Sequence, residues 1–205
     1  MVVRIYMEVD GVINALQAPN LWGPKTFDSI DFGGYTFVWS TEAVASLEAM
    51  CSRDDVEIVW LTTWSSNINV LARLLGFGHV FAEARVIEEI EMWSTPFEKA
   101  DALLRDLEEN PLSGGWMWLD SVSDDVMQST EYVERMVMEN GYVPPISDVV
   151  GISPSMVKYM SKRIREDLVR KTPRLPDGRW NFEKIMREIK EAEDVDGQEL
   201  GKGEE

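Results

Sequence analysis

Cysteine, histidine and long apolar runs are scarce in this sequence of 205 residues. The single cysteine, Cys51, excludes an intramolecular disulfide framework and a zinc site built from cysteines. The single histidine, His79, has no neighbouring ligand in the sequence, so we reject a catalytic triad centred on histidine. No run approaches the roughly 18 consecutive apolar residues of a membrane helix. We therefore expect a cytoplasmic protein without a membrane partner.

Positive charge is also scarce, because 20 basic residues face 37 acidic ones and the net charge is −17. Such a charge disfavours non-specific binding along DNA, although by itself it would also fit acidic mimicry of DNA. One segment reverses the sign, since residues 158–174 hold seven basic and two acidic side chains. Its apolar residues have helical spacing, so we interpret it as a solvated amphipathic helix. A docking surface for RNA or for an acidic partner is the alternative.

Short apolar segments alternate with amphipathic ones along the chain. Strands are predicted at 2–9, 56–61, 79–82, 116–119 and 146–150, and a short one at 35–39 after a long loop. Helices are predicted at 40–51, 65–75, 95–108, 123–139, 153–168 and 182–192. Ser65 is the expected cap of the second helix. This alternation predicts an α/β fold of three layers, α/β/α and Rossmann-like, with a central parallel sheet.

Polar side chains follow three of the predicted strands, and a lysine lies early in a helix between two of them. Ligands bind at the carboxyl ends of parallel strands, so residues that follow different strands meet at one edge. Carboxylates are the ligands that Mg²⁺ prefers, and hydroxyl and ammonium groups hold phosphate oxygens. Any one of these residues could be polar only because turns are polar, but the ordered set favours a site. The set comprises Glu8, Asp10, Thr62, Thr63, Lys99, Asp120 and Asp124.

The same residues carry a resemblance to a known superfamily. The segments MEVDGVIN (7–14), VWLTTW (59–64), PFEKADAL (96–103) and WMWLDS (116–121) resemble the four ordered motifs of the haloacid dehalogenase (HAD) superfamily. More narrowly, the chain is similar to the small, minimally capped HAD-like proteins of actinobacteria and their phages, including the HAD domain proposed in RNA-repair proteins. The resemblance covers about residues 2–168, and it implies a HAD fold without a large cap.

The resemblance implies a role for each matching residue. Asp10 would be the general acid and base, Thr62 with Thr63 would bind phosphate, and Lys99 would neutralise charge and also contact phosphate. Mg²⁺ would be the cofactor. Its expected ligands are Glu8, Asp10, Asp120 and Asp124, with Asp125 a weaker candidate.

Two positions depart from the family pattern. Glu8 stands where the family has the aspartate nucleophile, and its extra methylene moves the attacking oxygen by more than about 1 Å, a displacement that can cost on the order of 100-fold in rate. Ser121 stands where this subgroup often has a second acid, which predicts weaker metal binding.

Tryptophan is abundant, with eight residues, and most of these are expected in the core. Trp60, Trp116 and Trp118 lie within predicted strands. Trp64 directly follows the threonines at the mouth of the predicted site, where it could stack on a base or simply wall the pocket. Trp22 lies in the long loop, where it could belong to a flap over the site or pack on the surface.

The resemblance and the residues together give the expected organisation. Residues 1–175 form the HAD-like domain, with a flap or loop at 14–40, followed by a helical extension at 176–194 and a disordered acidic tail at 195–205. The leading hypothesis is a Mg²⁺-dependent phosphohydrolase acting on a small-molecule phosphomonoester, such as a nucleotide, or on a nucleic-acid end. The rival hypothesis, motivated by Glu8 and Ser121, is a catalytically silent scaffold that binds a phosphorylated ligand or a protein partner.

Overall fold

The computed structural model describes residues 2–15, 27–32, 34–112, 114–121, 123–129, 131–132, 141–144, 146, 151–165, 175–176, 181, 183–184 and 187. Several predictions lie outside this part of the chain. They concern Trp22, the end of the helix at 123–139, residues 147–150 of a strand, most of the helix at 182–192, most of the basic stretch beyond residue 165 and the acidic tail. The side chain of Asp124 is also outside it.

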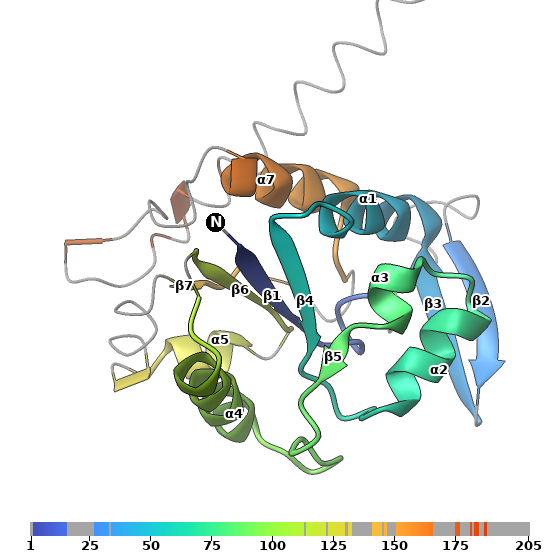
Figure 1. Ribbon diagram of the computed structural model, residues 1–205, viewed down its shortest axis with the longest axis horizontal. Helices are drawn as coiled ribbons and strands as arrows, with labels where there is room; N and C mark the ends of the chain where they lie inside the picture. Colours follow the sequence, from blue (N-terminus) through green and yellow to red (C-terminus); the bar gives the residue numbers. More distant parts are fainter. Residues whose placement is uncertain are drawn as a thin grey trace, which may run out of the picture.

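A parallel sheet of five strands forms the centre of the molecule, in the order β5-β4-β1-β6-β7 (Figure 1). The strands are β1 (Val3–Met7), β4 (Val56–Trp60), β5 (Arg85–Val86), β6 (Trp116–Leu119) and β7 (Gly141–Tyr142). The central strand β1 pairs with β4 on one side and β6 on the other, so that Met7 lies beside both Trp60 and Leu119. The three strands therefore end level with one another.

Helices cover both faces of the sheet, as the three-layer prediction requires. Figure 1 shows α1 (Thr41–Cys51) and α7 (Pro154–Arg165) on one side, and α4 (Pro96–Glu109) and α5 (Ser123–Met127) on the other. The short helices α2 (Asn67–Leu74) and α3 (His79–Ala82) connect β4 to β5. The described part of the basic stretch belongs to α7, whose residues Met156, Met160 and Ile164 are buried. No helix of the described residues is long and apolar enough to cross a membrane.

The predicted strand at 79–82 is wrong, because this segment is the helix α3. The amide of Phe81 donates to the carbonyl of Gly78, and its ring is fully buried. The indole of Trp60 donates to the carbonyl oxygen of Phe81 at 3.0 Å, which ties this turn to the sheet. A four-residue apolar run cannot be told from a buried helical turn by its pattern, and here tertiary packing selects the helix. The third strand follows at β5.

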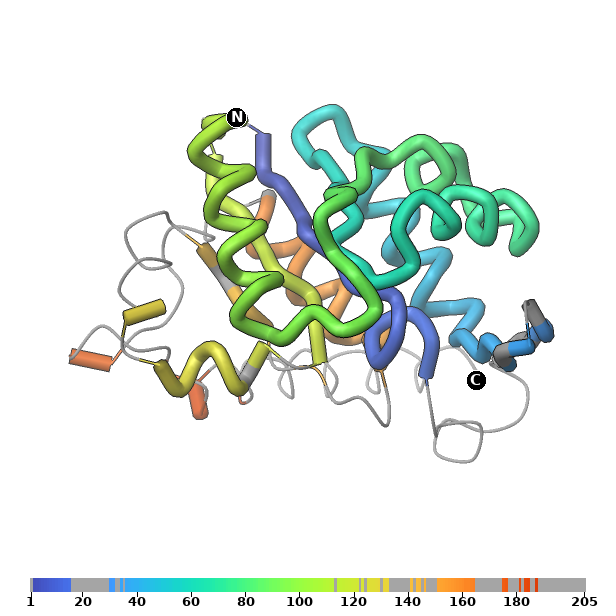
Figure 2. The backbone as a smooth tube through the Cα atoms, turned by 90° about the horizontal axis from the view of Figure 1, so that it is seen from below, coloured from blue at the N-terminus to red at the C-terminus, as the bar shows by residue number. Residues whose placement is uncertain are grey.

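The long loop also hides a strand. β2 (Phe27–Phe32) and β3 (Tyr35–Ser40) form an antiparallel hairpin, whose turn contains Gly34 with a φ of +87°. Phe37 and Trp39 of β3 are buried in the core. Figures 1 and 2 place the hairpin at one end of the molecule, beside α2 and far from β7. Two aspartates within β2 disfavour a strand by propensity, and pairing with β3 overrides that preference.

β7 at Gly141–Tyr142 was not predicted from the sequence, and the strand predicted at 146–150 lies mostly outside the described residues. The prediction that three tryptophans of the strands belong to the core is confirmed. Trp60, Trp116 and Trp118 are buried, with exposed fractions of 1% or less.

A network of charged and polar side chains joins α4 to residues Arg4 and Tyr6 of β1. Asp106 of α4 accepts hydrogen bonds from the Tyr6 hydroxyl at 2.6 Å and from Arg4 at 3.2 Å, and both groups are buried. Arg85 adds two bonds to the same carboxylate, at 2.6 and 2.8 Å. Burial raises the pKa of Asp106, but the hydrogen bonds of Arg85 and Tyr6 outweigh it and leave that pKa below its ordinary value. The network fixes α4 against the sheet.

We expect Asp106→Ala to lower the free energy of unfolding by about 3 kcal/mol, because it removes the buried one of the two carboxylates that pair with the Arg4 guanidinium and leaves the buried Tyr6 hydroxyl without its acceptor. Urea unfolding followed by tryptophan fluorescence measures the change. Glu89→Ala is the matched control, since Glu89 pairs with Arg105 at 2.9 Å on the surface and its loss should cost less than about 1 kcal/mol. Equal losses in the two variants would contradict a special role for the buried network.

Candidate active site

The candidate site lies at the carboxyl edge of the sheet. Glu8 directly follows β1, Thr62 comes two residues after β4, and Asp120 directly follows β6. Because these strands end level with one another, the three side chains meet at that edge, as the sequence predicts. All three are buried, and so is Lys99 of α4.

Lys99 is the centre of this group. Its ammonium forms an ion pair with Oε2 of Glu8 and another with Oδ2 of Asp120, the second at 2.9 Å. Burial alone lowers the pKa of Lys99, but the charges of Glu8 and Asp120 outweigh it and leave that pKa raised. The lysine therefore stays protonated at neutral pH.

The start of α4 determines where Lys99 lies. Thr95 caps the helix in a capping box, in which its hydroxyl accepts from the amide of Glu98 and its own amide donates to the Glu98 carboxylate. Pro96 occupies the first turn, where its missing N–H costs nothing. The first turn of α4 is thus fixed at a defined residue, and Lys99 follows at the end of that turn, facing the sheet.

Glu8 is held at both oxygens of its carboxylate. Oε1 accepts from the hydroxyl of Thr62 and from the amide of Val9 at 2.6 Å, while Oε2 contacts Lys99. Burial raises the pKa of Glu8, an effect that Lys99 and Thr62 oppose. The bond to Val9 shows that the longer side chain curls back toward its own backbone. Among the described residues, Glu8 is bonded to Thr62 and not to Thr63, which is half-buried.

Asp10 makes a different set of contacts. Its Oδ1 accepts from the side-chain amide of Asn14 at 2.7 Å, and its Oδ2 accepts from the indole N–H of Trp64 at 2.8 Å. Gly11, with a φ of +75°, begins the turn that brings Asn14 back to Asp10. Trp64 is therefore bonded directly to Asp10. Asn14 belongs to the first motif, but the sequence analysis assigned it no role. The hydrophobic pattern that identifies strands and helices does not show which residue of a turn will contact Asp10.

The loop between β4 and α2 has a strained backbone. Ser65 has a φ of +49°, which non-glycine residues rarely adopt, and the helix begins after Ser66 rather than after the predicted cap Ser65. The amide of Trp64 donates to the hydroxyl of Thr62 at 3.2 Å. This loop thus fixes Trp64 and the phosphate-binding candidate Thr62 relative to each other.

The carboxylates of this edge suit a divalent cation. Glu8 and Asp120 converge on the single ammonium of Lys99, so this buried trio has two carboxyl groups for one ammonium. Mg²⁺ commonly takes one or two protein carboxylates, with waters and substrate phosphate as its other ligands. Among the described residues, no three acidic, histidine or cysteine side chains form a complete metal cage. The donor set therefore fits a metal shared with a substrate rather than a closed structural metal site.

Two other residues of the fourth motif region are more accessible than the buried trio. Asp125 is exposed on α5, and Ser121 is half-buried after Asp120. The Ser123 hydroxyl donates to the backbone carbonyl of Asp120 at 2.8 Å, which fixes the start of α5 against the site.

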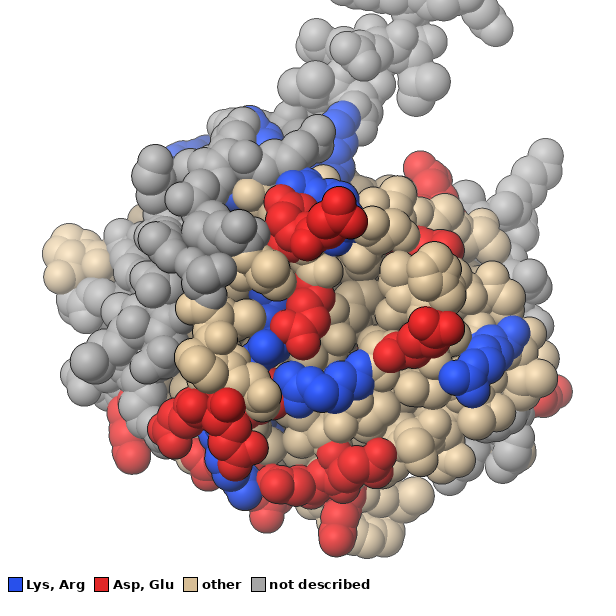
Figure 3. Space-filling model, viewed as in Figure 1, with Lys and Arg blue, Asp and Glu red and all other residues tan. Residues whose placement is uncertain are grey.

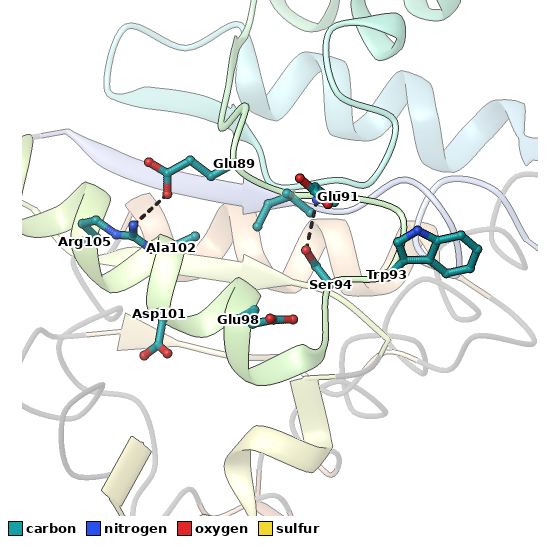
Figure 4. Close-up of a pocket in the computed structure, with 9 residues that line it drawn as sticks. Glu89, Glu91, Trp93, Ser94, Glu98, Asp101, Ala102 and Arg105 are labelled. Carbon is teal, nitrogen blue, oxygen red and sulfur yellow. Dashed lines mark hydrogen bonds and ion pairs between the residues drawn. The ribbon is translucent and has the colours of Figure 1, made fainter.

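A separate hollow of about 380 Å³ lies along α4 and the loop before it (Figure 4). Figure 4 shows Glu89 and Arg105 paired at one end and Trp93, which is 82% exposed, pointing outward at the other. Acidic side chains gather in this part of the molecule in Figure 3. The residues of the carboxyl-edge site do not line this hollow. It is therefore a surface feature distinct from the candidate active site.

Comparison with known proteins identifies one family. The family described as "HAD domain in Swiss Army Knife RNA repair proteins" matches residues 4–142, which is well over half of the chain. The matched range contains all of the residues at the carboxyl edge described above. No curated protein and no solved structure matches the chain. The chain belongs to the family of HAD domains found in Swiss Army Knife RNA repair proteins.

Proposed function

We propose that this protein is a Mg²⁺-dependent phosphohydrolase that removes a terminal phosphate from RNA or from a nucleotide. The observation that carries the proposal is the Lys99 ammonium held between the buried carboxylates of Glu8 and Asp120. A buried cation between two carboxylates at the end of a parallel sheet suits an anionic phosphate that arrives with a metal. The family's association with RNA repair supports the choice of substrate class.

Each residue of the edge has a role in this proposal. Lys99 and Thr62 would contact phosphate oxygens, with Thr63 as a neighbouring hydroxyl. Glu8 and Asp120 would hold Mg²⁺, and Asp124 is a further candidate ligand. The bound metal would neutralise phosphate charge and orient the phosphate for attack.

The proposed reaction has two steps. An oxygen of Glu8 attacks phosphorus, the bond from phosphorus to the ester oxygen breaks, and Asp10 gives that oxygen a proton. Water then attacks the phosphorus of the acyl-phosphate and gives a proton to Asp10. The bond from phosphorus to Glu8 breaks, which releases inorganic phosphate and restores both carboxyl groups.

The rival function is a scaffold that binds a phosphorylated ligand or a protein partner without turnover. One observation favours it: Oε1 of Glu8 is bonded to Val9 and Thr62, and Oε2 contacts Lys99. The oxygen that attacks phosphorus must first break these hydrogen bonds. The longer side chain of Glu8 also places that oxygen at a different position than an aspartate side chain would. The two functions make opposite predictions for substitutions at Glu8.

We expect wild-type protein to release phosphate in the presence of Mg²⁺, and Glu8→Gln to lose at least about 100-fold in rate because its amide cannot attack phosphorus. The panel contains oligoribonucleotides with a 5′- or 3′-phosphate, nucleoside monophosphates and 4-nitrophenyl phosphate. Glu89→Gln, an exposed acid far from the trio, is the control and should behave as wild type.

Glu8→Asp separates the two hypotheses in the same assay. Turnover by wild type shows that Glu8 is a working nucleophile. If wild type is inactive on the whole panel and Glu8→Asp is active, the site is intact but silenced, and the scaffold function replaces the one proposed. Inactivity of both, with Mg²⁺ and nucleotide still bound tightly, leads to the same replacement.

Metal binding can be measured without any substrate. Lys99→Met should lower the unfolding temperature, because Glu8 and Asp120 lose their shared cation. Mg²⁺ should then raise the unfolding temperature of Lys99→Met more than that of wild type, since the metal no longer competes with an ammonium. Lys162→Met, an exposed lysine of α7, is the matched control, with NaCl added to equalise ionic strength. An identical response of all three proteins to Mg²⁺ contradicts a metal site at these carboxylates.

A further inference from the structure

The contacts of Asp10 differ in kind from those of Glu8. Glu8 faces an ammonium and a hydroxyl, whereas the two oxygens of Asp10 each accept one N–H, from Asn14 and from Trp64. Two donors on two oxygens define both the position and the plane of a carboxylate. A group that transfers a proton depends on this orientation, because the transfer occurs over hydrogen-bond distances.

Both donors are in turn attached to strand β3 of the hairpin. Oδ1 of Asn14 accepts from the amide of Val38 at 2.9 Å, and the amide of Ala15 donates to the carbonyl of Val38 at 2.8 Å. The ring of Trp64 meets the ring of Phe37 edge-to-face, with centroids 6.2 Å apart. Neighbouring residues of β3 thus hold the two residues that hold Asp10.

The loop between β4 and α2 supports the contact between Trp64 and Phe37. The unusual backbone of Ser65 and the bond from the Trp64 amide to Thr62 fix the backbone from which the indole projects. Phe37 is 1% exposed, so its ring forms a fixed surface against Trp64. A movement of the hairpin would therefore be transmitted to Asp10 along two separate routes.

We propose that Asn14 and Trp64 are positioning residues for Asp10 and that the β2–β3 hairpin sets the orientation of the Asp10 carboxylate through them. The geometric part of this inference stands on the contacts alone. Its consequence for catalysis rests on the proposed phosphohydrolase function. The two parts need different measurements.

The first measurement follows the indole N–H signals of the eight tryptophans by ¹H–¹⁵N NMR, with Trp64→Phe assigning the signal of Trp64. Asp10→Asn should move that signal, because a neutral amide is a weaker acceptor than a carboxylate. Phe37→Leu and Asn14→Leu should move it as well, since each loosens one route between the hairpin and Asp10. The exposed Trp93, assigned by Trp93→Phe, is the internal control, and its signal should stay in place.

This measurement needs no enzymatic activity, so it decides the geometric inference even if the proposed function fails. A Trp64 signal that does not respond to Asp10→Asn overturns the bond between them. A response to Asp10→Asn without any response to Phe37→Leu or Asn14→Leu overturns the role of the hairpin. Circular dichroism and urea unfolding of each variant show whether it is folded, and a variant that does not fold is replaced by Phe37→Met or Asn14→Ser.

The second measurement separates kcat from KM on a substrate that the phosphatase panel identifies. Trp64→Phe keeps the aromatic ring and the backbone bond to Thr62 but removes the N–H, so we expect kcat to fall about 10- to 100-fold with KM within about threefold. Asn14→Leu should behave alike, whereas Trp93→Phe should match wild type. Phosphate binding through Thr62 and Lys99 is untouched in these variants. A rise in KM with unchanged kcat would instead make Trp64 a substrate contact and overturn its positioning role.

Discussion

The buried ammonium of Lys99 is the strongest constraint on this structure, because a charge removed from water is stable only beside opposite charges. Glu8 and Asp120 supply them, and they come from two strands that must end level for both carboxylates to reach one nitrogen. The capping box at Thr95 and the polar network around Asp106 fix α4 at its two ends. The charge cluster that forms the candidate site therefore depends on both the parallel register and the position of α4.

Asp10 lies two residues from Glu8 but belongs to a different structural unit. The Lys99 trio is part of the sheet and α4, whereas the carboxylate of Asp10 is bonded by a turn residue, Asn14, and a loop residue, Trp64, both in contact with the hairpin. The site thus combines a rigid charged part, suited to binding phosphate and metal, with a part whose geometry depends on a peripheral element. In the proposed function, the sheet and α4 would hold phosphate and metal, and the hairpin would set the orientation of the group that transfers the proton.

Much of this arrangement could be predicted from local sequence. Apolar runs marked β1, β4 and β6, and the rule that ligands gather at the carboxyl ends of strands identified Glu8, Thr62, Lys99 and Asp120 as neighbours. The secondary-structure predictions were wrong where the local sequence fits a helix, a strand or a loop equally well. The run at 79–82 became α3 because Phe81 packs in the core beside Trp60, and β2 lay unrecognised in a polar segment because its strand character comes from pairing with β3.

The sequence by itself determined which residues carry charge and which strands they follow, because hydrophobic periodicity and strand-end chemistry are local properties. Only the tertiary structure decided how those residues are paired. Glu8 shares Lys99 with Asp120, Trp64 bonds to Asp10, and Asn14 joins the first motif to Val38 of the hairpin. These contacts join residues far apart in the chain, and their geometry depends on register, helix position and loop conformation together. The sequence pattern along the chain does not predict these three features together.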